Sequence, residues 1–348
     1  MKIFQILPEM HEGGVERHVL WLSNELAAMG HDVTVVSAGG KLEGDLKGVK
    51  TTRLPVHLKN PVTALYSALA IARAAKREKA DIIHAHSRVP AWIAWWASAV
   101  SGVPWIATCH AFYSRNAGLI PYKKAGTLIS VSEAVRSFFM DLHPETENKV
   151  VYNGLPLSQH RWRGSKEGPA KFLFVGRLSR TKGILTLIEA FSRLNSGDWT
   201  LDVIGDGPLF GQIKTMISAY GIENRVKLHG FYDAPEEWMA KCSCFLFPSL
   251  EEGMGLTLMR AVQMGAPVIA SDLPAVREIS LSCSVLVNPG DVEAWARAIK
   301  GFLKSGVSAA IFDSEKILTS TKMAKSVEKI YAEIIQKKMR TKQWQKKR

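Results

Sequence analysis

The sequence predicts an α/β protein built from two domains, each containing a parallel sheet with helices on both faces. Short apolar segments of strand length alternate with helical segments along the chain, which is the pattern of β-α-β units. The length of 348 residues suits two domains. A polar segment marked by glycine and proline, Asn153–Pro169, interrupts the alternation and is predicted to be the linker.

The segments before the linker form the first predicted domain. Val15–Gly30 has apolar residues at helical spacing and ends at a glycine, and Val62–Lys79 is a second helix. Ser132 suits the N-cap of a later helix. The predicted strands are Lys2–Leu7, Asp32–Ser37, Asp81–His84, Pro104–Thr108, Thr127–Val131 and Lys149–Tyr152.

A second series of strands and helices follows the linker. It includes a helix at Val292–Leu303 and a long final helix, roughly Ser314–Met339, which is amphipathic and then becomes basic. Two α/β halves of similar size favour a ligand site in a cleft between them. The predicted strands of this half are Lys171–Gly176, Leu201–Ile204, Val226–Leu228, Ser243–Phe247 and Pro267–Ala270.

Positive charge is concentrated at the C-terminal end of the chain. The net charge is +13, and Lys337–Arg348 holds seven Lys or Arg and no acidic residue. Such a segment is either solvated or attracted to anionic lipids, at about 1 kcal/mol per basic residue. Trp344 is a candidate interfacial anchor. A basic nucleic-acid-binding protein is an alternative, but no helix-turn-helix, zinc-finger or RNA-binding aromatic signature occurs.

The cysteines and apolar segments favour a protein of the reducing cytosol. No Cys-x-x-Cys pair with further metal ligands occurs, which disfavours a zinc framework, and Cys242 and Cys244 suit core thiols. The N-terminus lacks the pattern of a secretory signal. Ala91–Ala107 is too short and too interrupted to span a membrane, so a buried helix followed by a strand is expected.

Two loops carry residues suited to a ligand with phosphates. Gly13 and Gly14 follow the first predicted strand at the start of a helix, where backbone amides attract anions, although a tight turn also explains them. Gly176–Gly183 follows the strand that opens the second series and contains Arg177 and Lys182. These two cations suit a diphosphate whose leaving charge must be stabilised; the alternative is a solvated basic turn.

A third loop lies within Phe247–Ala261, between a predicted strand and a helix. The free amides of Met254, Gly255 and Leu256 can point at an anion. Glu252 beside them suits hydrogen bonds from sugar hydroxyls, because a carboxylate next to a phosphate otherwise repels the ligand. A charged loop with a helix cap is the alternative.

Together these segments resemble the family-four retaining glycosyltransferases, a group with the two-domain GT-B fold. The resemblance covers nearly the whole chain, and its specificity comes from the order and spacing of the motifs. They are Gly13–Glu16, Asp81–Ser87, Thr108–His110, Val131–Glu133, Asn153–Gly154, Gly176–Arg177 with Lys182–Gly183, Gly205–Pro208, and Glu252–Gly255 through Gly265–Val268.

The resemblance implies a catalytic set of four residues. Arg177 and Lys182 bind the donor diphosphate and neutralise it as it leaves, Glu252 holds hydroxyls of the donor sugar, and His110 lies near that sugar and its phosphate. In such enzymes the anomeric configuration is retained, and one proposed route is front-face attack in which the leaving phosphate takes the acceptor proton. No metal and no cofactor are implied, because the Arg and Lys supply the electrostatic stabilisation.

The resemblance also implies a wider donor site with one departure. Gly13 and Gly14 approach the donor phosphates or the acceptor, and the amides of Met254, Gly255 and Leu256 help to hold the donor sugar. The family's second Glu, which binds the ribose hydroxyls, is replaced by Arg260. This change swaps a hydrogen-bond acceptor for a donor. Either the ribose is held otherwise, or the nucleotide preference differs, or Arg260 contacts a phosphate of the donor. UDP is the family default, and GDP or ADP stays open.

The domain boundaries expected for this fold follow the linker. Residues 1–155 form the acceptor domain, 156–312 the nucleotide-sugar donor domain, 313–340 a helix that packs back on the first domain, and 341–348 a basic tail.

The expected function is transfer of a sugar from a nucleotide sugar to a glycan or lipid-linked acceptor, in lipopolysaccharide core or envelope polysaccharide assembly. The expected place is the cytoplasm, with contact to the inner membrane surface through the basic end. A nucleotide-sugar epimerase with a similar fold is the alternative enzyme, but it needs additional acid/base carboxylates near the donor.

Other polar and aromatic residues have two interpretations each. His84 and His86 alternate at a strand end and are structural or acceptor-site residues, since a metal needs more ligands. Trp92, Trp95 and Trp96 suit either helix packing or a sugar-stacking platform.

Overall fold

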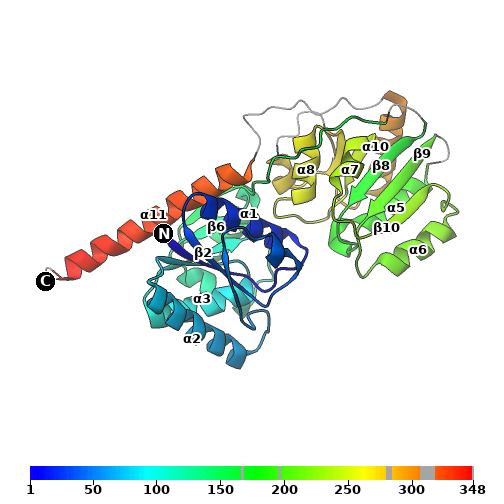
Figure 1. The fold of residues 1–348 in the computed structure, drawn as a ribbon. Helices are drawn as coiled ribbons and strands as arrows, with labels where there is room; N and C mark the ends of the chain where they lie inside the picture. Colours follow the sequence, from blue (N-terminus) through cyan, green and yellow to red (C-terminus); the bar gives the residue numbers. More distant parts are fainter. Residues whose placement is uncertain (166–167, 195–196, 280–283, 306–317, 347–348) are drawn as a thin grey trace. The chain divides into compact units, whose positions relative to one another are not determined.

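The computed structural model describes the chain except residues 166–167, 195–196, 280–283, 306–317 and 347–348, and it describes 341–346 by backbone alone. The chain divides into a first unit, Met1–Pro156 with Leu318–Arg348, and a second unit, Leu157–Ile317. Each unit contains one parallel sheet with helices (Figure 1). The predicted α/β class with two sheet-containing domains is confirmed.

The first unit contains a seven-stranded parallel sheet in the order β3-β2-β1-β4-β5-β6-β7. In it β1 pairs with β2 on one side and with β4 on the other. Because the strands are parallel, the residues that follow β1, β4 and β5 meet at one edge of the sheet. The strands are β1 (Lys2–Ile6), β2 (Asp32–Ser37), β3 (Lys50–Arg53), β4 (Ile82–Ala85), β5 (Trp105–Cys109), β6 (Leu128–Ser130) and β7 (Asn148–Val150).

Helices cover the first sheet where the apolar periodicity predicts them. The hydroxyl of Ser132 accepts a hydrogen bond from the backbone N–H of Val135 at 3.2 Å, which confirms the predicted N-cap. The Ala91–Ala107 segment forms the end of one buried helix and then a strand, as expected. The helices are α1 (Gly14–Ala28), α2 (Pro61–Glu78), α3 (Arg88–Ser101) and α4 (Glu133–Leu142), with the 3-10 turns η1 (Lys41–Asp45) and η2 (Ala117–Lys124).

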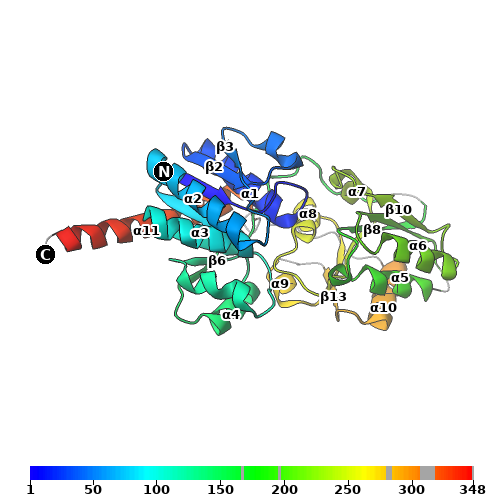
Figure 2. The same cartoon turned by 90° about the horizontal axis from the view of Figure 1, so that it is seen from below.

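The last helix, α11 (Ser320–Lys346), returns to the first unit, as predicted. Val327 and Tyr331 of α11 share one apolar cluster with Leu22 and Leu26 of α1. The predicted start at Ser314 lies outside the described residues. The helix runs beyond Met339 to Lys346, so most of the segment expected as a tail is helical, and its last turns extend past the sheet (Figures 1 and 2).

Two connecting segments of the chain run side by side where α11 begins. Leu155 and Thr319 form a parallel β-bridge, and the Leu155 N–H donates to the Leu318 carbonyl at 3.0 Å. A Cβ at Gly154 would lie 2.0 Å from the Thr319 carbonyl oxygen, so only glycine fits this close approach. The glycine of the Asn153–Gly154 motif therefore holds the start of α11 against the end of the first sheet domain.

The second unit contains a six-stranded parallel sheet in the order β10-β9-β8-β11-β12-β13. The largest side chains of its core are Trp199, Trp295, Phe172 and Phe191. Its strands are β8 (Ala170–Val175), β9 (Trp199–Ile204), β10 (Val226–Gly230), β11 (Cys244–Phe247), β12 (Val268–Ser271) and β13 (Ser284–Val287). Its helices are η3 (Arg180–Lys182), α5 (Ile184–Ser192), α6 (Phe210–Ala219), α7 (Glu236–Lys241), α8 (Leu256–Met264), α9 (Pro274–Arg277) and α10 (Val292–Ser305).

The described cysteines are core thiols. Cys109, Cys242 and Cys244 are free and buried, and burial raises the pKa of each thiol. The interpretation of the Cys242 and Cys244 pair as core is confirmed, and Cys283 lies outside the described residues.

Candidate active site

The strand order of the second unit reverses between β8 and β11. In open parallel sheets, ligands bind beyond the carboxyl ends of the strands at such a point. Two loops leave the sheet there, Gly176–Gly183 after β8 and Pro248–Gly255 after β11. They carry the predicted residues Arg177, Lys182 and Glu252, so the topology alone brings the predicted donor-binding residues to one edge.

A close backbone contact joins these two loops. The Leu250 N–H donates to the Thr181 carbonyl at 2.8 Å. Gly183 has a φ of +67°, and a Cβ there would lie 1.8 Å from the Pro248 carbonyl oxygen. Any other residue at position 183 would be strained and would push the loops apart.

Contact between the loops places Lys182 against Glu252. The Lys182 ammonium forms an ion pair with Glu252 Oε1, which also accepts a hydrogen bond from the Ser249 hydroxyl at 2.8 Å. The Glu252 side chain is 9% exposed and that of Lys182 is 31% exposed. Arg177 lies exposed on the loop after β8. A cation accessible to solvent and a shielded carboxylate therefore lie side by side.

The loop after β11 leads directly into α8. Gly255 is the N-cap with a φ of +73°, and a Cβ there would lie 2.8 Å from the Phe247 ring. Leu256 is the first residue of α8, and Met254 is buried before it. The first amides of a helix have no carbonyl partner within it, so this end of α8 presents donors beside Glu252.

Arg260, which replaces the family's second Glu, is engaged inside the second unit. Its Nε lies 3.2 Å from Glu236 Oε1 of α7, and its guanidinium also donates to Gln263 Oε1. The Arg260 side chain is 11% exposed. A carboxylate therefore does lie next to position 260, but it belongs to Glu236, which was not among the predicted site residues.

The strand order of the first unit also reverses, between β1 and β4. Gly13 and Gly14 lie at the start of α1, with Gly13 extended at the N-cap. A Cβ at Gly13 would lie 2.2 Å from Glu16 Oε2, so the Glu16 carboxylate covers this glycine. Burial raises the pKa of Glu16. The predicted anion-binding turn is therefore faced by the chain's own carboxyl group.

His110 follows β5 and belongs to a chain of hydrogen bonds. Its Nε2 lies 3.1 Å from His86 Nδ1, and His86 Nε2 lies 2.6 Å from Gln5 Oε1. Gln5 Nε2 in turn donates to the Tyr331 hydroxyl of α11 at 3.1 Å. The orientation of His110 is thus linked to His86 after β4, to Gln5 of β1 and to Tyr331 of α11.

Two further histidines lie beside this chain. His84 Nδ1 lies 2.7 Å from the Tyr331 hydroxyl and His84 Nε2 lies 2.7 Å from Thr108 Oγ1. His18 Nδ1 lies 2.8 Å from Asn153 Oδ1. His84 was predicted from its strand, whereas His18 was not predicted, although its position four residues before Leu22 places it on the buried face of α1.

Burial keeps this group of histidines neutral. Desolvation lowers the pKa of His18 to about 4, and it lowers the pKa of His84, His86 and His110 well below the ordinary value. Neutral imidazoles both donate and accept hydrogen bonds. His110 is thereby suited to hydrogen bonding with a ligand rather than to charge neutralisation.

The predicted site residues fall into two groups, one in each unit. The structure brings Lys182 and Glu252 into direct contact. The group of the second unit is Arg177, Lys182, Glu252, Met254, Gly255, Leu256 and Arg260, and the group of the first unit is Gly13, Gly14 and His110.

The tryptophans of α3 are in mutual ring contact, with Trp92 5.4 Å from Trp95 and 5.5 Å from Trp96 between ring centroids.

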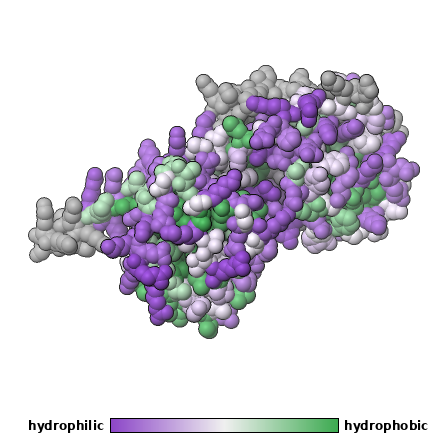
Figure 3. Space-filling view, in the orientation of Figure 1, coloured by the Kyte–Doolittle hydropathy of each residue, from purple (hydrophilic) through white to green (hydrophobic). Residues whose placement is uncertain are grey.

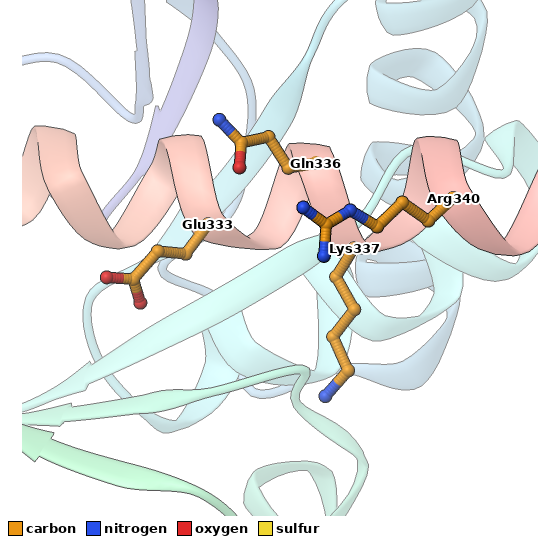
Figure 4. Close-up of a pocket in the computed structure, with 4 residues that line it drawn as sticks. All are labelled: Glu333, Gln336, Lys337 and Arg340. Atoms are coloured by element: carbon orange, nitrogen blue, oxygen red, sulfur yellow. The ribbon is translucent and has the colours of Figure 1, made fainter.

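A pocket on α11 includes none of the predicted site residues among its described lining. It is lined by Glu333, Gln336, Lys337 and Arg340, which all come from α11 (Figure 4). These side chains are long and polar and come from one helix, which is not the convergent lining of a small-molecule site. Among the described residues, no helix combines the length and apolar character needed to cross a membrane.

Family comparisons match both halves of the chain. The model of Glycosyltransferase Family 4 matches residues 12–159, and the model of Glycosyl transferases group 1 matches residues 169–305. The first match ends and the second begins within the predicted linker, and together they contain every predicted site residue.

Curated relatives extend over most of the chain. A glycogen synthase of Mycobacterium tuberculosis is 25% identical over 354 residues, covering 87% of this chain and 85% of the relative. The lipopolysaccharide core biosynthesis glycosyltransferase LpsE of Rhizobium meliloti is 25% identical over 303 residues, covering 83% of this chain and 85% of the relative.

A solved structure supports the same fold. The Anabaena protein HepE, crystallised with UDP and glucose, superposes with a TM-score of 0.74 at 20% identity and covers 98% of this chain and 99% of its own. At that identity the likeness concerns the fold, which is GT-B. The motifs, the two parallel sheets and the family matches together identify the chain as a glycosyltransferase of family four, in the glycosyl transferases group 1.

Proposed function

We propose that this glycosyltransferase moves a sugar from a nucleoside-diphosphate sugar to a glycan or lipid-linked acceptor, with retention of configuration and without a metal ion. The observation that carries the proposal is the contact of Glu252 with both Lys182 and Ser249 at the strand reversal of the second unit. A cation next to a shielded carboxylate matches the two parts of a sugar diphosphate, an anion and a set of hydroxyls.

Each group at this edge has a distinct role in the proposal. Lys182 and the exposed Arg177 bind the diphosphate and stabilise the charge that develops as it leaves. Glu252 accepts hydrogen bonds from hydroxyls of the donor sugar. Ser249 donates to Glu252 Oε1 and keeps that carboxylate oriented when Lys182 turns to the phosphates. The first amides of α8 contact the same sugar.

The proposed reaction needs no protein nucleophile. The bond from the anomeric carbon to the diphosphate oxygen breaks, and the acceptor oxygen bonds to the same face of that carbon. The leaving phosphate oxygen takes the acceptor proton. The anomeric proton coupling of the product in NMR tests this route, since an inverted product would exclude it.

UDP is the proposed nucleotide, and a substitution of Arg260 tests how this position affects its binding. The family default and the UDP bound to HepE support this choice. A carboxylate at position 260 would accept hydrogen bonds from ribose hydroxyls, which a guanidinium cannot do. Because Arg260 pairs with Glu236, a variant with a carboxylate at position 260 must also remove the negative charge of Glu236. We expect Arg260→Glu with Glu236→Gln to bind UDP about tenfold more tightly, as one or two hydrogen bonds of about 1 kcal/mol would give.

A thermal-shift panel of UDP, GDP, ADP and CMP in EDTA checks this prediction, because a ligand of the native state raises its stability. Glu236→Gln alone is the matched control and isolates the effect of position 260. Weaker UDP binding by the double variant would mean that Arg260 itself contacts the nucleotide. A preference for GDP or ADP in the wild type would replace UDP as the donor nucleotide.

We also propose a place and a pathway for the reaction. The LpsE relative acts in lipopolysaccharide core biosynthesis and supports envelope glycan assembly. The chemistry of a nucleotide-sugar donor suits the cytoplasm. The basic end of α11 would then contact the anionic inner face of the membrane. Hydrophilic side chains project from α11 along its described part (Figure 3).

Deleting Lys337–Arg348 is expected to reduce binding to anionic liposomes more than tenfold, because seven basic residues are lost at about 1 kcal/mol each near the surface. Activity on a soluble acceptor is expected to change less. Co-sedimentation with liposomes measures the first effect. Lys325→Gln with Lys329→Gln, on exposed positions earlier in α11, is the control for loss of charge. Equal sedimentation of wild type and deletion would remove the membrane contact from the proposal.

A further inference from the structure

Three histidine side chains of the first unit converge on one point. His18 comes from α1, His86 follows β4 and His110 follows β5. One ring nitrogen of each lies within 4.8 Å of the other two, and the His86 Nδ1 to His110 Nε2 distance is 3.1 Å. Nitrogens at the corners of a tetrahedral zinc site lie about 3.3 Å apart, given metal–nitrogen distances of about 2.0 Å.

The spacing of the rings agrees with that of a three-histidine metal site. The ring centroids lie 4.7 Å apart for His18 and His110, 5.4 Å for His18 and His86, and 5.4 Å for His86 and His110. A ring centroid lies about 3.2 Å from a metal bound to its nitrogen, which places the centroids of two ligands about 5 Å apart at a tetrahedral angle. Small shifts of the rings would therefore close the site.

The outer contacts of two of these rings set the tautomer that a metal needs. His18 Nδ1 lies 2.8 Å from Asn153 Oδ1, and His86 Nε2 lies 2.6 Å from Gln5 Oε1. Each ring N–H donates to an amide oxygen, which leaves the lone pair of the other nitrogen, His18 Nε2 or His86 Nδ1, directed into the group. Metal-binding histidines almost always donate their second nitrogen in this way.

One buried nitrogen of the group has no partner. His18 is 2% exposed, and its Nε2 makes no hydrogen bond. A buried polar atom without a partner destabilises the fold, so such an atom calls for an explanation.

We propose that His18, His86 and His110 bind one late first-row divalent cation, of which Zn²⁺ is the type, with a water in the fourth position. Three imidazoles suit zinc, cobalt or copper, whereas Mg²⁺ and Ca²⁺ prefer oxygen ligands. His110 is the least buried of the three and gives the metal its path of entry. His84 is excluded from the ligand set because both of its ring nitrogens are engaged by Tyr331 and Thr108.

The consequence for transfer rests on the proposed function. A metal on His110 Nε2 holds this ring inside the histidine group, so the ring can no longer turn toward the donor sugar and its phosphate, near which the family resemblance places it. Zinc at this site is therefore an inhibitor of sugar transfer and not a cofactor. Transfer in EDTA is expected to be at least as fast as without EDTA.

Titration with Co²⁺ tests the site without reference to activity. We expect the wild type to bind one equivalent and to develop the intense visible absorption of tetrahedral cobalt, which Zn²⁺ then displaces. His18→Gln and His110→Gln are expected to weaken binding more than tenfold, since even loss of an outer contact costs about 10–100-fold. His84→Gln is the matched control, because it changes a buried neighbour that holds no metal.

The outcomes separate the site from the reaction. Absence of the tetrahedral spectrum in the wild type, or an unchanged spectrum in His18→Gln and His110→Gln, would overturn the site whatever the enzyme does. If His18→Gln does not fold, His110→Gln carries the test from a less buried position. Inhibition of transfer by Zn²⁺ that follows occupancy supports the consequence, and full activity of the zinc-loaded enzyme would overturn it. Failure of transfer in EDTA would count against the proposed function and leave the cobalt result standing.

Discussion

Lys182→Ala is expected to lower kcat/KM for sugar transfer by at least about 100-fold, because the removal of one preorganised group that stabilises leaving charge costs about 10²–10³-fold. The structure places this ammonium against Glu252, 31% exposed and at the edge of the sheet where ligands bind. Steady-state release of the nucleoside diphosphate measures the loss. The effect should fall mainly on kcat, since the charge on the diphosphate develops in the transition state.

The controls for this variant come from the same loop. Arg180→Ala removes an exposed cation two residues away in the same 3-10 turn and is expected to change kcat/KM by less than about threefold. Glu252→Ala is expected to lower activity more than tenfold through a weaker hold on the donor sugar. Activity of Lys182→Ala equal to that of Arg180→Ala would refute the assignment of Lys182.

Gly183→Ala is expected to destabilise the second unit by about 3 kcal/mol and to abolish most of the activity. The added Cβ would lie 1.8 Å from the Pro248 carbonyl oxygen at a φ of +67°. A left-handed backbone costs a residue other than glycine about 1–2 kcal/mol, and overpacking costs about 1–3 kcal/mol. The loops after β8 and β11 must then separate, which parts Lys182 from Glu252. Urea unfolding measures the change in free energy.

Gly211→Ala is the matched control for this change. Gly211 lies within α6, and nothing lies within 4 Å of a Cβ placed there. Alanine is favoured over glycine in a helix by about 0.5–1 kcal/mol, so this variant should be slightly more stable than the wild type. A Gly183→Ala protein as stable as the Gly211→Ala protein would contradict the close approach of the two loops.

The fold could be predicted because its strands are apolar and its turns are marked by glycine. β3 was missed for the same reason, since its residues, Lys50–Arg53, are all exposed and polar. The predicted end of α11 at Met339 was too early. Tyr331 and the partly buried Ile334 pack on the core cluster of the first unit, whereas polar turns continue to Lys346. An apolar pattern predicts the packed part of a helix and not its solvated end.

The contacts within the site could not be predicted from the sequence. Lys182 and Glu252 are 70 residues apart, and they meet because β11 pairs directly with β8. Gln5 and Tyr331 are 326 residues apart and meet because α11 returns to the first sheet. The motifs indicated which residues matter, whereas strand order and chain return decide which of them touch.

The convergence of His18 with His86 and His110 has the same origin. From the sequence, His84 and His86 were expected at one strand end, and two histidines are too few ligands for a metal. The further ligands come from α1 and from the next strand of the sheet. Only the order β1-β4-β5 and the packing of α1 over it bring the three rings together.

Calorimetric titration of UDP into the wild type and into Lys182→Ala, both in EDTA, shows whether the loops after β8 and β11 hold a nucleoside diphosphate through Lys182 without a metal. We expect saturable binding of UDP at one site by the wild type, and binding at least about tenfold weaker by the variant, a loss of about 1.4 kcal/mol. Equal binding by the two proteins, or binding that disappears in EDTA, would contradict that expectation.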